Sequence, residues 1–212
     1  MNAVDADRGR EIVQELVDVI VENRSYLSEV DGAIGDGDHG INMAKGFRQC
    51  GEEIADRALS LSEALESLSD MLMDNIGGSM GPLYGSFFMG MSEAVEDADT
   101  VDADTFARML EEGLDSLRTV SEAGVGDKCL MDTLVPAARA AREAVDAGKP
   151  FQEVLAATRN AAEAGRDSTR DLVARIGRAA RLGERSKGVL DAGATSACLL
   201  VCRLADALEK RG

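Results

Sequence analysis

The chain has 212 residues, with 23 basic and 39 acidic side chains and a formal net charge of -16. This acidity argues against nucleic acid and against an anionic membrane as partners. The sequence contains 3 prolines, no tryptophan and 3% aromatic residues, a composition typical of packed helices, so we expect an all-α fold. No segment resembles a linker, and residues 1–212 are expected to form a single domain.

Apolar residues recur at helical spacing along most of the chain. In the first expected helix, at residues 6–24, the apolar stripe includes Ile12, Leu16 and Ile20. Further helices are expected at about residues 39–54, 60–76, 82–95, 103–122, 131–147, 150–176 and 194–210. Glycine-rich stretches at residues 31–42, 77–85, 124–128 and 177–196 interrupt this pattern, and up-and-down helices could bring several of them to one end of a bundle.

Ligand chemistry is concentrated in residues 31–43, which contain three aspartates, four glycines, one asparagine and the only histidine. Asp36 and Asp38 alternate with glycines, so the backbone can turn tightly and direct both carboxylates to one point, to which Asp31 can fold back. Three carboxylates that close would repel one another unless a cation lay between them. Oxygen ligands without a thiolate suit Mg²⁺, which fills its remaining positions with water and substrate phosphates. The stretch therefore predicts a metal and phosphate site.

A solvated acidic turn and an EF-hand loop are alternative interpretations of this stretch. A solvated acidic turn before a helix stays open, because Asp and Gly are both common in such turns. An EF-hand loop fails on register: with Asp36 in its first position, the glycine position holds Ile41 and the closing glutamate position holds Phe47. On the helix that follows, Asn42 and Lys45 can face one ligand, and the free N–H groups at its start suit an anion.

Two further stretches are candidates for anion binding. The glycines of residues 77–85 would let backbone approach a phosphate or adenosine closely, although such turns are weak evidence alone. Residues 178–187 carry Arg178, Arg181, Arg185 and Lys187, which form either an anion site or a solvated loop paired with acidic neighbours. No P-loop motif is present, so a nucleotide would have to be held through metal.

The remaining sequence signals concern location and cysteines. Residues 1–7 lack the basic and apolar regions of a signal peptide, and no stretch approaches membrane-spanning length, so we expect a cytoplasmic protein. The cysteines form no C-x-x-C pair and have no companion histidines, which makes a zinc site improbable. Cys198 and Cys202 are four residues apart and should share a helix face as small buried residues.

Five ordered motifs resemble the L subunit of dihydroxyacetone kinase (DhaL), a nucleotide-binding component. They are Gly-Asp-Gly-Asp-His-Gly-Ile-Asn-Met at residues 35–43, Gly-Gly-Ser-Met-Gly-Pro-Leu-Tyr-Gly at 77–85, Gly-Asp-Lys at 126–128, Gly-Glu-Arg-Ser at 183–186 and Asp-Ala-Gly-Ala-Thr-Ser at 191–196. The resemblance extends from about residue 10 to the C-terminus. It implies an eight-helix antiparallel up-and-down barrel with ADP or ATP and two Mg²⁺ ions at one end.

The resemblance also implies roles for individual residues. Asp31, Asp36 and Asp38 would be the magnesium ligands and, with His39, the catalytic group. The nucleotide would be contacted by His39, Gly40, Ile41, Asn42, Gly78, Ser79, Met80, Ser121, Leu130, Arg178, Asp191, Ala192 and Gly193. Two departures affect this set: the family has Ala-Ser where this chain has Ser79-Met80, and proline where it has Ala192. Both bear on the fine geometry of nucleotide binding.

The activity implied is transfer of a phosphoryl group from the nucleotide to a short ketose held covalently on a histidine of a separate K subunit. Because 212 residues leave no room for the K portion, we expect a separate subunit and not a fused kinase. For a separate L subunit the resemblance implies the phosphotransferase-system enzyme, in which ADP stays bound and a third, M subunit rephosphorylates it. One alternative is an ATP-dependent kinase subunit acting on a tetrulose such as erythrulose. Another is a regulatory protein whose nucleotide state controls binding to a transcription factor. A homodimer also stays open.

Overall fold

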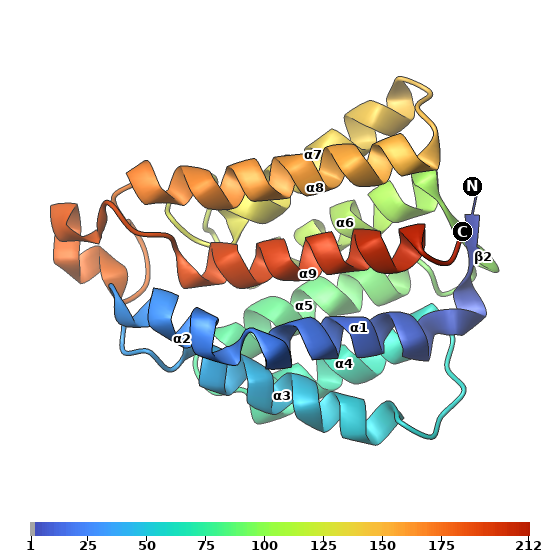
Figure 1. Cartoon of the computed structure of the whole chain (residues 1–212), viewed down its shortest axis with the longest axis horizontal. Coiled ribbons are helices and arrows are strands. Elements are labelled where there is room, and N and C mark those ends of the chain that lie inside the picture. Colours follow the sequence, from blue (N-terminus) through green and yellow to red (C-terminus); the bar gives the residue numbers. More distant parts are fainter. Residues whose placement is uncertain (1–2) are drawn as a thin grey trace.

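The computed structural model describes residues 3–212 and has an all-α fold, which confirms the predicted class (Figure 1). Within these residues the α-helices are α1 (Gly9–Glu22), α2 (Arg24–Gly32), α3 (His39–Ile54), α4 (Leu61–Asn75), α5 (Met80–Glu93), α6 (Ala103–Arg118), α7 (Met131–Asp146), α8 (Phe151–Ser168) and α9 (Ala192–Glu209). The short elements are the strands β1 (Ala3–Asp5) and β2 (Thr100–Asp102) and the 3-10 helices η1 (Ala6–Arg8), η2 (Thr169–Asp171) and η3 (Ala179–Ser186).

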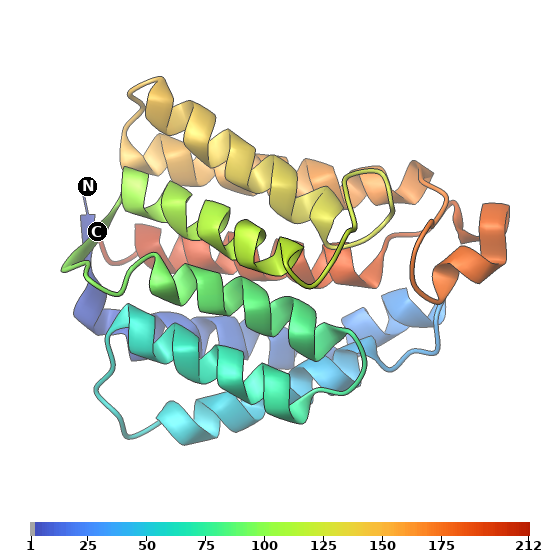
Figure 2. The same ribbon diagram turned by 180° about the vertical axis from the view of Figure 1, so that it is seen from behind.

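The long helices form a closed ring. From α3 to α9 each helix packs against the next one along the chain, α9 packs against α1, and α1 packs against α3. Successive helices run in opposite directions, so α3, α5, α7 and α9 all begin at the same end of the barrel (Figures 1 and 2). The paired strands β1 and β2 and the end of α9 lie at the other end.

The ring encloses one continuous apolar core. The predicted stripe of α1 faces it, since Ile12, Leu16 and Ile20 are fully buried. Phe47 of α3 and Phe88 of α5 meet edge to face with ring centroids 6.2 Å apart, an arrangement that aromatic pairs prefer. Because every long helix contributes to this core, packing rather than helix propensity holds the helices in place.

The eight expected helices correspond to α1 and α3–α9, and α2 is additional to them. Asn23 separates α1 from α2: its backbone N–H and its side-chain amide both donate to the carbonyl of Val19, which ends α1 and lets the chain restart in a new direction. Leu27 is the one fully buried residue of α2. Helical periodicity failed to reveal α2 because this helix is short and mostly polar.

The helix expected at residues 150–176 ends earlier, at Ser168. The hydroxyl of Ser168 donates to the carbonyl of Gly165 at 2.7 Å, and that of Thr169 donates to the carbonyl of Arg166 at 2.6 Å. Such side-chain bonds compete with helix continuation. The chain then passes through η2 into an irregular segment that precedes η3.

Two other features concern the remaining expectations. Within residues 3–212 no helix is both long enough and apolar enough to cross a bilayer. Cys198 and Cys202 share a face of α9 as expected, with their Sγ atoms 3.9 Å apart, and all four cysteines are free thiols.

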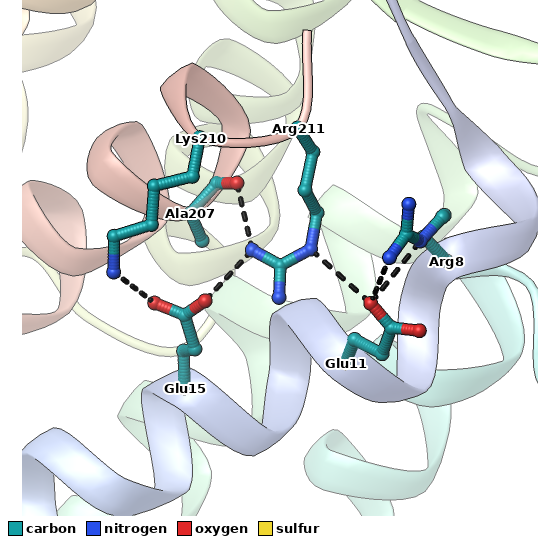
Figure 3. Close-up of polar contacts among 6 residues, drawn as sticks. All are labelled: Arg8, Glu11, Glu15, Ala207, Lys210 and Arg211. Atoms are coloured by element: carbon teal, nitrogen blue, oxygen red, sulfur yellow. Dashed lines mark hydrogen bonds and ion pairs between the residues drawn. The ribbon is translucent and has the colours of Figure 1, made fainter.

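Charged side chains join the two ends of the chain at the end of the barrel that carries the strands (Figure 3). Arg211 donates through Nη1 to Glu15 of α1 at 2.7 Å and to the carbonyl of Ala207 at 2.8 Å, while its Nε lies 3.5 Å from Glu11. Lys210 reaches the other oxygen of Glu15 at 3.1 Å. The side chain of Arg211 is 14% exposed and that of Lys210 is 62% exposed, so the arginine is the better shielded partner.

We expect Arg211→Met to lower the free energy of unfolding by about 2 kcal/mol, because it leaves a half-buried Glu15 short of its main partner. Lys210→Met is the matched control and should cost less than about 0.5 kcal/mol, as exposed ion pairs contribute little. Urea denaturation of both variants measures the difference. Equal losses in the two variants would contradict the assignment of Arg211 as the principal contact.

Candidate metal and anion site

A cavity of about 610 Å³ opens at the end of the barrel where α3, α5, α7 and α9 begin. All four glycine-rich stretches of the sequence contribute residues to its lining. They meet there because each of them connects helices at this end of the ring, as the blue, green and orange connections of Figure 2 show.

Three carboxylates form one cluster in this cavity. Asp31, Asp36 and Asp38 each place an oxygen within 4.8 Å of the others. Asp31 lies in the last turn of α2, Asp36 in the connecting loop and Asp38 immediately before α3. Asp31 and Asp38 are half-buried and Asp36 is exposed. Three hard oxygen donors this close suit a divalent cation such as Mg²⁺.

The glycines of the loop make this approach possible. At Gly35 an added Cβ would lie 2.5 Å from Oδ1 of Asp31, so a side chain there would displace that carboxylate. Gly37 adopts a φ of +76°, which L side chains rarely occupy, and its N–H donates to Oδ2 of Asp31 at 2.8 Å. The loop therefore folds around Asp31, which turns it toward the other two carboxylates.

Four helix N-termini surround the same cavity. The residues that precede α3, α5, α7 and α9 all line it: Asp38, Ser79, Leu130 and Asp191. The first N–H groups of a helix have no partner inside the helix, and the helix dipole places partial positive charge there. An acidic protein without a P-loop thus presents anion-binding groups at this end.

His39 is held by a hydrogen-bonded group drawn from three helices. Its Nε2 lies 2.8 Å from Oγ of Ser196 on α9, and that oxygen lies 2.6 Å from the hydroxyl of Tyr84 on α5. Tyr84 also donates to the carbonyl of Gly193 at 3.0 Å. Burial lowers the pKa of His39 to about 4, against the opposing effect of the Asp31 carboxylate. The imidazole is therefore neutral at physiological pH and fixed in orientation.

Asp191 caps α9 at the cavity wall. Its carboxylate accepts the N–H of Ala194 at 2.8 Å, as an N-cap residue does. Burial raises the pKa of Asp191 from its ordinary value of 3.8 to about 6, although the N–H of Ala194 and the ammonium of Lys128 both favour the ionised form. Ala192 and Gly193, the first residues of α9, complete this part of the wall.

Arg178 reaches the carboxylate cluster from the irregular segment between α8 and α9. Its guanidinium forms an ion pair with Asp36. Arg175, which precedes the basic stretch of residues 178–187, lies 3.7 Å from Asp127. Among the basic residues of that stretch, Arg178 alone lines the cavity.

Most of the predicted site residues lie together on the cavity lining. They are Asp31, Asp36, Asp38, His39, Asn42, Gly78, Ser79, Met80, Ser121, Leu130, Arg178, Asp191, Ala192 and Gly193. Gly40 and Ile41 lie outside this lining. Gly40 faces α2, where an added Cβ would lie 2.0 Å from the carbonyl of Arg24, and Ile41 is 49% exposed. Gly40 therefore serves the packing of α3 on α2.

No role was predicted for three residues that the structure places at the site. Tyr84 and Ser196 join His39 to α5 and α9, and Lys128 lines the cavity as a buried cation. Tyr84 and Ser196 are 112 residues apart in the chain, so no local pattern indicates their contact. The one local signal was Lys128, a charged residue in a glycine-containing break between two helices.

The fold and site define an all-α barrel with a carboxylate cluster and a wall of helix N-termini at one end. A comparison with known families matches residues 33–206 to the DAK2 domain, and the chain belongs to this family. This confirms the resemblance to the L subunit that the sequence motifs predicted.

Two relatives are similar over almost their full length. The ADP-binding subunit DhaL of PEP-dependent dihydroxyacetone kinase 1 from Listeria innocua is 38% identical over 182 residues, covering 85% of this chain and 86% of that protein. The corresponding DhaL subunit from Escherichia coli K12 is 33% identical over 196 residues, covering 91% and 92%.

Among solved structures, the dihydroxyacetone kinase from C. freundii in complex with AMP-PNP and Mg²⁺ has a TM-score of 0.69 and 22% sequence identity. The match covers 97% of this chain and 34% of that longer chain. At this identity the comparison establishes the shared fold, and the present chain corresponds to about a third of the C. freundii chain.

The half-buried carboxyl group of Asp191 predicts a pH effect on stability. Its raised pKa means that the native state holds this proton more tightly than the unfolded chain between pH 3.8 and about 6. The resulting stabilisation is present at low pH and is lost as pH rises through 6. Relative to Asp191→Asn, the parent should lose about 2 kcal/mol of unfolding free energy between about pH 4.5 and pH 7.5. Denaturation at both pH values measures this, and a pH-independent difference would contradict it.

Proposed function

We propose that the chain is the nucleotide-binding subunit of a dihydroxyacetone kinase, which transfers a phosphoryl group from a magnesium-bound nucleotide to dihydroxyacetone held on a separate K subunit. The observation that carries this proposal is the cluster of Asp31, Asp36 and Asp38 in a cavity ringed by four helix N-termini. The DhaL relatives at 33% and 38% identity are ADP-binding subunits, which supports ADP as the nucleotide.

In this proposal the three aspartates hold two Mg²⁺ ions. Bound there, Mg²⁺ would neutralise the charge of the phosphates and of the group in transfer. The contribution of the chain is to fix the ligands: Gly37 donates to Asp31, so that carboxylate is oriented before any ion binds. His39 is neutral and anchored to Ser196, and it presents its ring to the nucleotide without adding charge.

The remaining cavity residues are proposed to hold the nucleotide. Gly78 has a φ of +74° and open space around its Cα, so the loop before α5 can approach a phosphate closely. Ser79 and the N-terminus of α5 supply donors beside it. Arg178 is the cation that can exchange Asp36 for a phosphate oxygen when the nucleotide binds.

The surface around the cavity supports a protein partner at this end. The exposed large hydrophobic side chains of the described residues all lie on segments near the cavity: Tyr26, Ile41, Met73, Val120, Val125 and Ile176. They come from α2, the first turn of α3, the last turns of α4 and the connections after α6 and η2. Exposed apolar side chains on segments at one end of a molecule are consistent with a protein contact there. The K subunit, which must bring its ketose to the phosphoryl group, is the partner proposed there.

The proposed phosphoryl source is the phosphotransferase system, with ADP as a resident cofactor recharged by an M subunit. The test is to denature extensively dialysed protein and identify the released nucleotide by chromatography. About one ADP per chain supports a resident cofactor. Empty protein that binds ATP only with added Mg²⁺ would instead indicate an exchangeable substrate, and protein that binds neither nucleotide would overturn the proposal.

We expect Asp38→Asn to abolish nucleotide retention while the fold survives, because the variant loses one metal ligand and relieves repulsion within the cluster. Asp38 is a cleaner test than Asp36, whose replacement would also remove the ion pair with Arg178. Asp115→Asn, an exposed change on α6, is the control and should retain nucleotide as the parent does. Retained nucleotide and Mg²⁺ in Asp38→Asn would show that the metal assignment is wrong.

A further inference from the structure

The segment between α8 and α9 leaves the barrel and returns to it. It runs over residues 170–188, coloured orange in Figure 2, and contains η3. It also carries Arg178, which reaches the carboxylate cluster. Its two ends meet again: the N–H of Gly188 donates to the carbonyl of Arg170 at 2.8 Å, and the N–H of Asp191 donates to the hydroxyl of Thr169 at 3.1 Å. We call this meeting point, formed by residues 169–170 and 188–191, the stem.

The ammonium of Lys128 lies inside the stem. Its Nζ donates to the carbonyl of Thr169 at 2.5 Å and to that of Val189 at 2.6 Å, so one side chain links the two ends of the segment. Lys128 itself belongs to the loop before α7 and is 2% exposed. Its ammonium group thus joins three separate parts of the chain: the loop before α7, the end of α8 and the stretch before α9.

The position of Lys128 is unfavourable by itself. Among the described residues it is the only non-glycine with a positive φ, at 63°, a conformation that is uncommon for residues with a side chain. Burial of an ammonium group is costly unless partners compensate it. The compensation comes from the two carbonyls and from the nearby carboxylates of Asp191 and Asp132. Residues that their surroundings hold in an uncommon backbone conformation are typical of functional sites.

We propose that Lys128 is a positioning residue: by joining the two ends of segment 170–188 it holds Arg178 over the carboxylate cluster. The structural half of this proposal concerns the stem alone. The consequence for ligand affinity rests on the proposed function, because it requires a nucleotide that Arg178 contacts. Lys128 then acts on the nucleotide through Arg178, not by direct contact.

Lys128→Met tests the structural half. Methionine keeps the length of the side chain and the same backbone strain but removes both hydrogen bonds. We expect hydrogen exchange of residues 172–188 to rise roughly tenfold or more, with faster tryptic cleavage at Arg175, Arg181 and Arg185. Lys210→Met, an exposed lysine at the other end of the barrel, is the matched control and should leave this exchange unchanged. Unchanged exchange in Lys128→Met would overturn the proposal.

A double-mutant cycle tests the functional half. Titration with MgADP of nucleotide-free parent, Lys128→Met, Arg178→Met and the double variant gives four affinities. If Lys128 acts through Arg178, the double variant binds no more weakly than Arg178→Met within about twofold. Fully additive losses would contradict that route. Absence of MgADP binding in the parent would instead refute the proposed function and leave the result on segment 170–188 to stand on its own.

Affinity for Mn²⁺ alone separates positioning from general damage to the site. Lys128 touches none of the three aspartates, so Lys128→Met should bind Mn²⁺ as the parent does while it loses MgADP affinity. An equal loss of both would mean that the residue is merely structural, and would overturn the proposal.

A second variant serves if Lys128→Met does not fold. Thr169→Val is nearly isosteric and removes the hydroxyl that accepts the N–H of Asp191, so it weakens the stem from the other side. We expect faster exchange in residues 172–188, by a smaller factor than in Lys128→Met. Exchange equal to that of the parent would show that the stem does not hold the segment.

Discussion

The direction of successive helices is the constraint on which the site depends. In a closed ring of antiparallel neighbours, every second helix begins at the same end, and here α3, α5, α7 and α9 do so. Their dipoles place partial positive charge at this end of a chain with a net charge of -16. The same geometry brings the connecting loops together, so the fold itself assembles both the carboxylates and the donors that face them.

Asp31 shows how little freedom the carboxylate cluster has. One of its carboxylate oxygens accepts the N–H of Gly37, and the other would clash with any side chain at position 35. The backbone carbonyl of the same residue accepts the N–H groups of Ile34 and Gly35, at 3.1 and 2.6 Å. Asp31 therefore closes the loop that carries Asp36 and Asp38, and the three side chains form one unit. This explains why their glycine spacing was so informative in the sequence.

Sequence reasoning succeeded where information is local. The apolar stripes located α1 and α3–α9, and the density of aspartates and glycines in residues 31–43 indicated the carboxylate cluster. It failed for α2, which is short and mostly polar. It also failed for the end of α8, where the hydroxyls of Ser168 and Thr169 bond to backbone carbonyls and end the helix although the helical pattern continues. Three-residue strands such as β1 and β2 carry too few residues for any periodicity to be seen.

Contacts between distant parts of the chain were beyond reach for a different reason. His39 and Ser196 are separated by 157 residues, and Lys128 lies 61 residues from Val189. Their pairing depends on how the ring closes, which no single segment encodes. Motif resemblance supplied part of what periodicity lacked, since it marked the stretches that meet, but it did not state which atoms touch.

The ion pairs between α1 and Arg211 also bear on how the chain can be rearranged. They hold α1 and the end of α9 together, at the end of the barrel that carries the strands (Figure 1). The turn between α7 and α8 lies at that same end. A circular permutant that is opened in this turn, with its present ends joined by a short linker, would keep every helix and every cavity connection intact. Fused partners and labels can likewise be attached at either end without approaching the opening of the cavity.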